Sequence, residues 1–396
     1  MVEEVEQAIR RLKPNRSGGS DALTPEHLKF CGPIFKNWLC QLFNHLLTFE
    51  QIPQVFKQGV IIPVYKGKGR DPLLTSSYRG ITLTSVLAKS FEFILLERML
   101  PITEDLGCPQ LTQTAYRKNV SCVESMFASQ EALRCFTTEG DFVYSSFYDL
   151  QSAFDTVEYS ILLEDAGLKG KFWRIIKQWY NNPTSCVRVG NQSSSLFSVE
   201  RGVRQGSVLS PTLFNLVMDP LLSRLKSTHL GLNANGLFLG AFAHADDFRT
   251  HSTSVSDAKL QVSVVKSHTD SKGLKLCPQK CGVVVAAPQS FEQPNSLEVD
   301  GVCLPIEKSV KCLGVWFSSD QSSKTSIEEN IRKARRAFFA HGRLGVFHGL
   351  LNPLSSKSIF ECCVLPTLLY GAELWTLNIS LLSNLESFQS DLGRKC

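Results

Sequence analysis

Residues 240–250, GAFAHADDFRT, place two adjacent aspartates in a run that otherwise alternates like a buried strand. Successive side chains of a strand point to opposite faces, so Asp246 and Asp247 cannot both enter one apolar core. Two like charges side by side also make each other harder to ionise unless a cation compensates them. The plainer interpretation is a hairpin turn or a solvated loop, the commoner setting for a lone Asp-Asp pair. The run therefore predicts either an ordinary turn or a carboxylate pair that binds a cation.

A third carboxylate, Asp149, ends another predicted strand, in the run DFVYSSFYDL at 141–150. If the two strands are neighbours, the three carboxylates offer the hard oxygen ligands that Mg²⁺ prefers, together with substrate phosphates. Two ions about 3.5–4 Å apart would polarise an attacking hydroxyl and stabilise a leaving phosphate, which is nucleotidyl transfer. The alternative for Asp149 is an exposed carboxylate that caps the next helix.

The composition is compatible with such a site inside a sizeable core. A chain of 396 residues with 43% hydrophobic and 20% charged content predicts two or three subdomains without extensive disorder. The formal charge of +5 favours polyanions only slightly, but basic residues concentrate in two places. They are Lys66, Lys68 and Arg70, and then Arg332, Lys333, Arg335 and Arg336.

The cysteines and the N-terminus bear on the cellular compartment. Thirteen cysteines without a repeated Cys-x-x-Cys or Cys/His spacing indicate reduced intracellular thiols rather than a disulfide framework or a zinc module. The stretch MVEEVEQAIRR lacks the apolar core of a signal peptide, and no apolar run approaches the ~18 residues of a membrane span. We therefore expect an intracellular protein of the cytoplasm, the nucleus or both, with no membrane partner.

The apolar spacing predicts alternating helices and strands along the chain. Helices are expected at 3–13, 25–49, 78–100, 151–168, 172–180, 211–225 and 255–274, and beyond 326. Strands are expected at 58–66, 141–150, 282–287, 296–304 and 310–317, with a hairpin at 185–202 around a Gly-Asn turn. The change from strands to helices near residue 320 is the predicted domain boundary.

Two further segments carry residues suited to a nucleotide substrate. Phe154 follows Asp149 closely and could form a floor under an incoming sugar, although an isolated Phe in a helix is more often a core residue. Gln205 and Gly206 precede a helix opened by Ser-Pro, which would place backbone amides and the Gln amide near a nucleotide.

A third segment, IIPVYKGKGRDPLLTSSYRGITL, places Lys66 and Arg79 on either side of a flexible loop that could close on a triphosphate. Either side chain could instead be an ordinary solvated cation. Lys66 is the less certain of the two, because Lys68 could take its place.

In chain order, these segments resemble the reverse transcriptase of non-LTR retrotransposons, of the long interspersed element type, over nearly the whole chain. KPNRSGGSDALTPEHLK resembles the motif that opens that domain, YRGITLTSVLAKSFEFILLERM its arginine-bearing fingers motif, and LTQTAYRKNVSCVESM its Gln-x-Gly-Phe-Arg segment. FYDLQSAFDTV is similar to its first catalytic motif, GVRQGSVLSPTLFNL to its template-and-nucleotide motif, and AHADD to its Tyr-Ala-Asp-Asp. GLKLCPQKCGVVV resembles its lysine-bearing motif, and VKCLGVWF the strand that grips the primer end.

The resemblance implies an α+β right-hand polymerase fold with fingers, a palm made of an antiparallel sheet with helices on one face, and a helical thumb. Residues 1–140 would form an N-terminal extension and the fingers with part of the palm, 141–320 the palm with the primer-grip strands, and 321–396 a truncated thumb. It implies an RNA-directed DNA polymerase that uses an RNA template, a DNA primer or nicked target DNA, and dNTPs. Two Mg²⁺ ions would assist it, with Mn²⁺ as a substitute.

The resemblance also assigns roles to individual residues. Asp149, Asp246 and Asp247 would hold the two metals, with the carbonyl of Leu150 as a backbone ligand. Lys280 matches the lysine that approaches the active site and could protonate the pyrophosphate leaving group.

The nucleotide would be bound by a second set. Phe154 matches an aromatic gate that rejects a ribonucleotide by its 2′-OH. Lys66 and Arg79 match the positions that neutralise the triphosphate, and Gln205 and Gly206 would contact the nucleotide and the template.

Nucleic acid would be bound by a third set. His244 matches the residue under the primer terminus, and Leu313 with Gly314 lies in the primer-grip segment. The basic helix would follow the duplex backbone through Arg332, Lys333, Arg335 and Arg336, with Ile331, Ala334 and Phe338 toward the core. An ordinary charged helix face is the alternative.

Several positions depart from the family pattern. His244 replaces its tyrosine and can titrate near neutral pH, while Ala115, Tyr116 and Cys277 replace a glycine, another aromatic residue and an asparagine. A catalytically impaired remnant that only binds nucleic acid is therefore the alternative function. A group II intron maturase or a telomerase-like enzyme would share the palm, but the motif wording is closer to the retrotransposon type.

Overall fold

The computed structural model describes residues 1–67, 69–160, 167–287, 295–341 and 352–393. They form two compact units, each assembled from several stretches of the chain. Unit 1 comprises Met1–Tyr116, Leu150–Arg224 and Val265–Leu276, and unit 2 comprises Arg117–Asp149, Leu225–Val264 and Cys277–Cys396.

Unit 1 packs helices around an aromatic core. Its helices are α1 (Val2–Arg11), α2 (Pro25–Lys29), α3 (Pro33–Phe49), α4 (Gln54–Lys57), α5 (Val86–Asp105), α7 (Ala153–Thr156) and α9 (Gly170–Trp179). Phe91 on α5 lies 5.1 Å from Phe43 on α3 and 6.1 Å from Trp179 on α9, measured between ring centroids. These large buried rings join helices that are distant in the sequence.

The sheet of unit 1 mixes parallel and antiparallel neighbours. Its strands are β1 (Gln58–Tyr65), β2 (Tyr78–Thr84), β4 (Thr184–Val189), β5 (Gln192–Ser193) and β6 (Phe197–Ser198), and the 3₁₀ turn η1 (Thr75–Ser77) precedes β2. β1 runs antiparallel to β2 and parallel to β4. Val189 pairs with Gln192, which confirms the predicted hairpin around Gly190 and Asn191.

Unit 2 is built on a four-stranded antiparallel sheet in the order β11-β3-β10-β9. These strands are β3 (Val143–Tyr148), β9 (Ala241–His244), β10 (Asp247–Ser252) and β11 (Gly282–Ala286). The helix α6 (Cys122–Thr138) packs on the sheet and begins with a reciprocal capping box, in which Ser121 and Glu124 bind each other's backbone amides. Short hairpins β7 (Asn233–Ala234) with β8 (Leu237–Phe238), β12 (Ser296–Val299) with β13 (Val302–Pro305), and β14 (Ser309–Cys312) with β15 (Val315–Ser318) complete it.

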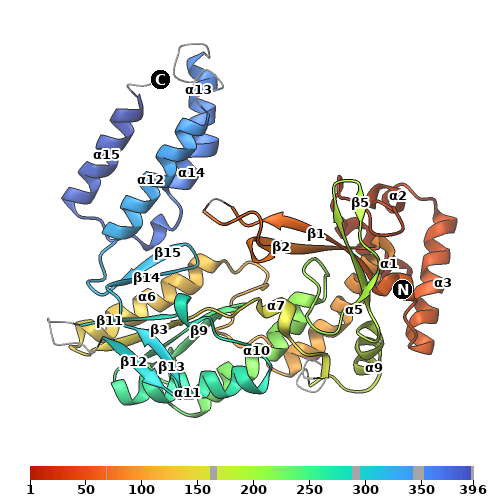
Figure 1. The fold of residues 1–396 in the computed structure, drawn as a ribbon, viewed down its shortest axis with the longest axis horizontal. Coiled ribbons are helices and arrows are strands. Elements are labelled where there is room, and N and C mark those ends of the chain that lie inside the picture. The colour runs from red at the N-terminus through yellow and green to blue at the C-terminus, as the bar shows by residue number, and fades with distance from the viewer. Residues whose placement is uncertain (68, 161–166, 288–294, 342–351, 394–396) are drawn as a thin grey trace. The chain divides into compact units, whose positions relative to one another are not determined.

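The C-terminal helices of unit 2 enclose their own apolar cluster. They are α12 (Lys324–Ala340), α13 (Pro353–Ile359), the π-helix η4 (Phe360–Val364), α14 (Leu365–Leu368) and α15 (Ile379–Gly393), with the 3₁₀ turn η5 (Ala372–Leu374) before α15. Figure 1 shows α12, α14 and α15 side by side. Ala334 and Phe338 are buried and Ile331 packs against them, so the predicted core face of this helix is confirmed.

Two long helices contribute residues to both units. They are α10 (Ser210–Ser227), in the place predicted for residues 211–225, and α11 (Val255–Ser271). Among the described residues, no helix combines the length and the apolarity needed to cross a membrane.

Five of the predicted elements are wrong in detail. Residues 25–49 form two helices because Gly32 and Pro33 interrupt them. Residues 78–84 form strand β2 rather than the start of the helix, since β1 supplies their hydrogen-bonding partners. Residues 296–304 and 310–317 are hairpins rather than single strands.

Left-handed residues explain these two hairpins. Asp300 and Gly301 have φ values of 50° and 77°, and Leu313 and Gly314 have 48° and 87°. Successive positive φ values turn a strand back on itself within two residues. Within the predicted helix at 151–168, α7 and residues 159–160 are helical, a bridge from Glu158 to Arg201 separates them, and residues 161–166 lie outside the described structure.

Candidate active site

The two adjacent aspartates occupy the tip of the β9–β10 hairpin. His244, the last residue of β9, pairs with Asp247, the first residue of β10, and only Ala245 and Asp246 lie between them. Ala245 has a φ of 58°, a backbone conformation that costs an L-residue energy. The predicted hairpin is confirmed, and its tip is polar.

The third aspartate lies at the same edge of the sheet. β3 pairs with β10 in a register that sets Tyr148 opposite Phe248. Because the strands are antiparallel, the next step along both brings Asp149 opposite Asp247. Tyr148 and Phe248 stack beneath this edge, with ring centroids 4.6 Å apart and planes 11° from parallel.

The three carboxylates interact electrostatically. Burial, together with the negative charges of Asp246 and Asp149, raises the pKa of Asp247 to about 6. Burial also raises the pKa of Asp246, and the charge of Asp149 acts in the same direction. A cation placed among them would relieve this repulsion.

Lys280 supplies one such charge. Its Nζ lies 2.6 Å from Oδ2 of Asp149, and its charge opposes the rise in the pKa of both hairpin aspartates. It lies in the 3₁₀ turn η2 (Pro278–Lys280). The amide of Cys277 donates to the carbonyl of Asp149 at 2.8 Å, which fixes this turn against the end of β3.

The carboxylates fit a divalent cation by their chemistry, since they are hard, mutually repelling oxygen donors. In the described residues, however, no three or more His, Cys, Asp or Glu side chains are already arranged to hold a metal ion. Asp149 instead holds the ammonium of Lys280.

Phe154 lies in unit 1 with part of the proposed nucleotide set. Its ring stacks on that of Phe214 with centroids 4.4 Å apart, and the ring of Tyr116 meets it edge-on at 6.5 Å. The side chain is half-buried. It is therefore fixed by aromatic packing on one side and retains exposed surface.

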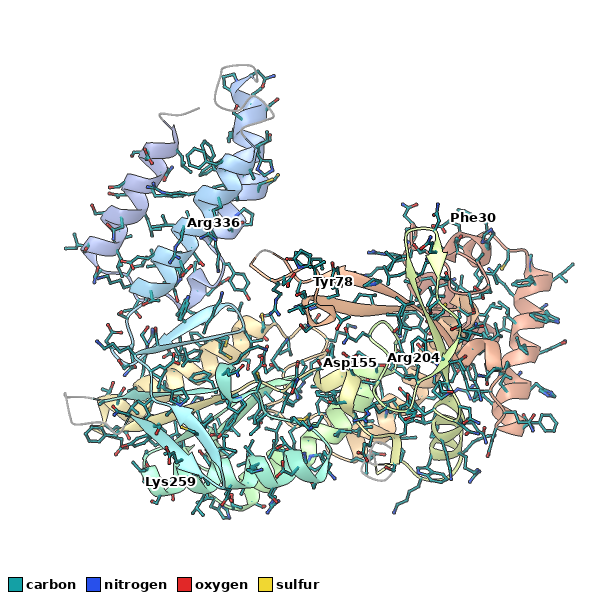
Figure 2. All side chains as sticks on the ribbon, viewed as in Figure 1. Phe30, Tyr78, Asp155, Arg204, Lys259 and Arg336 are labelled. Atoms are coloured by element: carbon teal, nitrogen blue, oxygen red, sulfur yellow. The ribbon has the colours of Figure 1, made fainter. Side chains whose placement is uncertain are left out.

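Gln205 is oriented by a residue that sequence reasoning missed. Its Nε2 donates to Oδ1 of Asp155 at 2.9 Å. Partial desolvation of the carboxylate raises the pKa of Asp155, and this hydrogen bond and the charge of Lys66 oppose the rise. Figure 2 labels Asp155, on α7 directly after Phe154. The only available signal was a second acidic residue in FYDLQSAFDTV.

The loop that carries Gln205 is anchored on two sides by buried charges, also missed from the sequence. Glu92 of α5, fully buried, accepts hydrogen bonds from the hydroxyl of Ser207 at 2.8 Å and the amide of Val208 at 2.7 Å. Arg204, labelled in Figure 2, donates to the backbone carbonyls of Phe56 and Lys57. A charged residue inside an otherwise apolar helix, as in FEFILL, is the pattern that could have indicated Glu92.

Gly206 is held close to β2. A Cβ atom at this position would lie 2.6 Å from the carbonyl oxygen of Thr82, and its φ of 124° is open only to glycine. The amide of Thr82 donates to the carbonyl of Gln205 at 2.8 Å. The Gln205 loop is therefore hydrogen-bonded to β2.

Beside this loop, unit 1 contains a cleft of about 540 Å³. Gly206, Val208 and residues of β2 form one part of its lining, and no Asp or Glu lines it. Four cations do: Arg11, Lys13, Arg16 and Lys89. Such a lining suits a polyanion.

Lys66 and Arg79 are both exposed at the end of the β1–β2 hairpin. Nζ of Lys66 donates to the carbonyl of Ser76 at 2.8 Å, and Arg79 lies opposite Val64 in the register of the two strands. Lys68 lies outside the described residues. Leu150 is buried directly after Asp149 and bridges to Leu276.

The proposed nucleic-acid residues of unit 2 lie on three elements. His244 is half-buried on β9, and burial followed by the charge of Arg249 lowers its pKa, so it is neutral at neutral pH. Leu313 and Gly314 form the β14–β15 turn, where the hydroxyl of Tyr370 donates to the carbonyl of Leu313 at 2.8 Å.

The basic helix α12 exposes Arg332, Arg335 and Arg336, while Lys333 is half-buried. Arg332 pairs with Glu329 at 2.6 Å and Arg335 with Asp391 at 3.4 Å. Arg336 is labelled on this helix in Figure 2.

A mixed helix and sheet protein whose antiparallel sheet carries three carboxylates at one end is compatible with the class of right-hand polymerase folds. The chain belongs to the reverse transcriptase (RNA-dependent DNA polymerase) family, whose model matches residues 65–317.

Its relatives include proteins of insect mobile elements. It is 25% identical to the putative 115 kDa protein of the type-1 retrotransposable element R1DM of Drosophila melanogaster, over 94% of this chain and 36% of that protein. It is 24% identical to the RNA-directed DNA polymerase from mobile element jockey of Drosophila funebris, over 94% of this chain and 41% of that protein. The predicted resemblance to non-LTR retrotransposon reverse transcriptases is confirmed.

This chain therefore spans about two fifths of the curated relatives that it matches. Among solved structures, it is similar to apo telomerase from Candida tropicalis truncated from the C-terminal domain. That similarity has a TM-score of 0.45 and 12% identity, and it covers 72% of this chain and 58% of that one.

Proposed function

We propose that the chain is an RNA-directed DNA polymerase of a non-LTR retrotransposon, which transfers a nucleotide from a dNTP to a primer 3′-OH on an RNA template. The observation that carries this proposal is the register of β3 and β10, which sets Asp149 opposite Asp247 at the hairpin tip. Family membership supports it, because these carboxylates lie within the matched residues 65–317.

Asp149, Asp246 and Asp247 would hold two Mg²⁺ ions, or Mn²⁺ in their place, with the carbonyl of Leu150 as a further ligand. When bound, the ions would polarise the attacking hydroxyl and stabilise the leaving phosphate. Lys280 would protonate the pyrophosphate leaving group. Its ammonium, 2.6 Å from Oδ2 of Asp149, supports this role because it lies beside the carboxylates that would hold the ions.

The nucleotide would be bound by residues of unit 1. Phe154 would act as the gate against a 2′-OH, and its packing on Phe214 supports this role because a steric gate must be rigid. Gln205 would contact the nucleotide, oriented by Asp155. Lys66 and Arg79, both exposed, would neutralise the triphosphate.

Residues 1–140 would form the N-terminal extension and the fingers with part of the palm, 141–320 the palm, and 321–396 the thumb. The cationic cleft beside Gly206 would hold the template strand. His244, Leu313 and Gly314 would contact the primer end. The basic helix α12 would follow the duplex backbone through its exposed arginines.

An enzyme of this kind would work in the cytoplasm, the nucleus or both, on an RNA template and on a DNA primer or nicked target DNA.

The test is extension of a DNA primer on poly(rA) with dTTP and Mg²⁺. We expect synthesis by the parent chain, and loss of at least about a thousandfold in D246N and D247N variants, since these remove a metal ligand. K259M is a matched control, because Lys259 is exposed on α11 (Figure 2) and should leave the rate unchanged. Binding of the primer–template duplex without any synthesis by the parent would overturn the polymerase and favour the nonenzymatic remnant.

A further inference from the structure

A fully buried arginine lies directly behind the acidic hairpin. Arg249 is the third residue of β10 and is 0% exposed. In the described part of the chain, no carboxylate lies within ion-pair distance of its guanidinium. Burying a charge without a paired countercharge is costly, so other contacts must stabilise it.

The helix α6 provides most of these contacts. Nε of Arg249 donates to the hydroxyl of Ser129 at 2.9 Å. Nη2 donates to the hydroxyl of Ser125 at 2.9 Å and to its carbonyl at 2.5 Å. The guanidinium also lies 5.2 Å from the ring centroid of Phe242 and 5.9 Å from that of Phe317. Arg249 therefore joins β10 to α6 with a fixed geometry.

The hydrogen bonds continue to a second buried side chain of β10. Ser129 Oγ lies 2.6 Å from Nε2 of His251, and Nδ1 of His251 lies 2.9 Å from the hydroxyl of Ser145 on β3. His251 is 0% exposed, and its burial lowers the pKa far enough to keep the ring neutral. Because Ser129 accepts from Arg249, its own proton can go to Nε2, and Nδ1–H then donates to Ser145.

This network shares a face of the strand with the catalytic candidate. Asp247, Arg249 and His251 lie on the same face of β10, because side chains two residues apart in a strand point the same way. Phe248 and Thr250 belong to the other face, where they meet Tyr148. The Cα atoms of Asp247 and Arg249 are therefore roughly 6.6 Å apart. Burial raises the pKa of Asp247 and lowers that of Arg249, and the attraction between the two charges opposes both shifts in part.

We propose that Arg249 is a positioning residue for the acidic hairpin: through Ser125 and Ser129 it fixes β10 against α6 two residues after Asp247, and its charge compensates that of Asp247. This role rests on the proposed polymerase function, because it matters for turnover only if the hairpin binds the catalytic ions. It requires no contact between Arg249 and substrate. The sequence motif AHADD ends before this residue.

The first experiment needs no enzymatic activity. Urea unfolding of the metal-free protein at pH 7.5 is measured for the parent, R249M, D247N and the double variant, in EDTA. If the two substitutions acted independently, their effects on the unfolding equilibrium constant would multiply. We expect the unfolding equilibrium constant of the double variant to be about threefold to a hundredfold smaller than that product. The pair K259M and D247N should show no such coupling. Additive effects of R249M and D247N would overturn the proposal.

The second experiment separates positioning from simple loss of structure. R249K keeps the charge but loses the forked donor geometry, and S129A keeps Arg249 while it removes one of its acceptors. In primer extension we expect kcat of R249M to fall by about ten- to a hundredfold with KM for dTTP changed less than about threefold, and R249K to recover part of the loss. S129A should show a smaller fall in kcat at an unchanged affinity for the primer–template duplex.

If R249M fails to fold, R249K and S129A are tested instead, again by comparing the fall in kcat with the change in KM for dTTP. Equal falls in duplex affinity and kcat, without recovery in R249K, would overturn the positioning role. If the parent chain shows no synthesis, the polymerase proposal fails. The coupling between Arg249 and Asp247 is still tested by the urea unfolding of the first experiment, which needs no activity.

Discussion

At the scale of single residues, the polar groups around the site are explained by what they contact rather than by how exposed they are. Glu92 is a completely buried carboxylate, yet two donors of the Gln205 loop surround it. Burial raises its pKa above the ordinary 4.5, and those two hydrogen bonds oppose the rise only in part. Glu92 therefore makes stability depend on pH.

E92Q should change that dependence. Because the folded pKa is raised, the stability present below pH 4.5 is lost as pH rises through the folded pKa. A glutamine has the same shape but does not titrate, so E92Q loses no stability in this way as pH rises. The free energy of unfolding of E92Q relative to the parent should thus increase from pH 4.5 to pH 8, measured by urea unfolding at several pH values. A difference that is flat with pH would show that Glu92 does not titrate differently on folding.

Asp155 gives a second prediction at this scale. D155A should free the amide of Gln205 and raise KM for dTTP by about three- to tenfold, with a smaller change in kcat, since one orienting hydrogen bond of about 1–2 kcal/mol is lost. T156A is the neighbouring control, because the Thr156 hydroxyl donates to the backbone of its own helix α7. Steady-state kinetics with varied dTTP concentration measure KM and kcat for both variants. An unchanged KM in D155A would exclude the orienting role of Asp155.

At the scale of elements, sequence reasoning was strong where a pattern is local. The acidic hairpin, the Gly-Asn hairpin and the core face of α12 follow from alternation, turn residues and helical spacing. Residues 78–84 were assigned wrongly because their partner β1 lies across the loop 66–77, and spacing within one segment does not reveal its pairing with another. For the same reason the sequence did not indicate Asp155, Glu92 or the cationic cleft, which depend on contacts between distant segments.

The β14–β15 turn offers a test of such a contact. Gly314 and Gly301 both have positive φ in two-residue turns, but a Cβ on Gly314 would lie 2.8 Å from the ring of Tyr370, whereas nothing lies within 4 Å at Gly301. G301A should cost about 1 kcal/mol from backbone strain alone, and G314A about 2–3 kcal/mol because the ring must also move. The difference in unfolding free energy measures the contact. Equal costs would mean that the turn adapts without Tyr370.

At the scale of the whole molecule, a net charge of only +5 conceals local concentrations of cations on each unit. The cleft of unit 1 is lined by four cations without an acid. In unit 2, α12 exposes three arginines, two of which already pair with acids. Distribution, rather than the total, therefore determines how strongly each unit attracts a phosphate backbone.

Salt dependence separates a phosphate contact from a solvated charge on α12. Each phosphate contact releases counterions and contributes about 0.9 to the slope of log Kd against log salt concentration. R336Q should lower that slope by about one for an RNA–DNA duplex, measured by fluorescence anisotropy between 50 and 200 mM salt. R335Q should lower it less, because Arg335 pairs with Asp391 at 3.4 Å and lies 5.7 Å from the ring centroid of Phe388. Slopes that equal the parent's in both variants would make α12 an ordinary charged helix face, since a helix that follows the duplex cannot lose such a cation without releasing fewer ions.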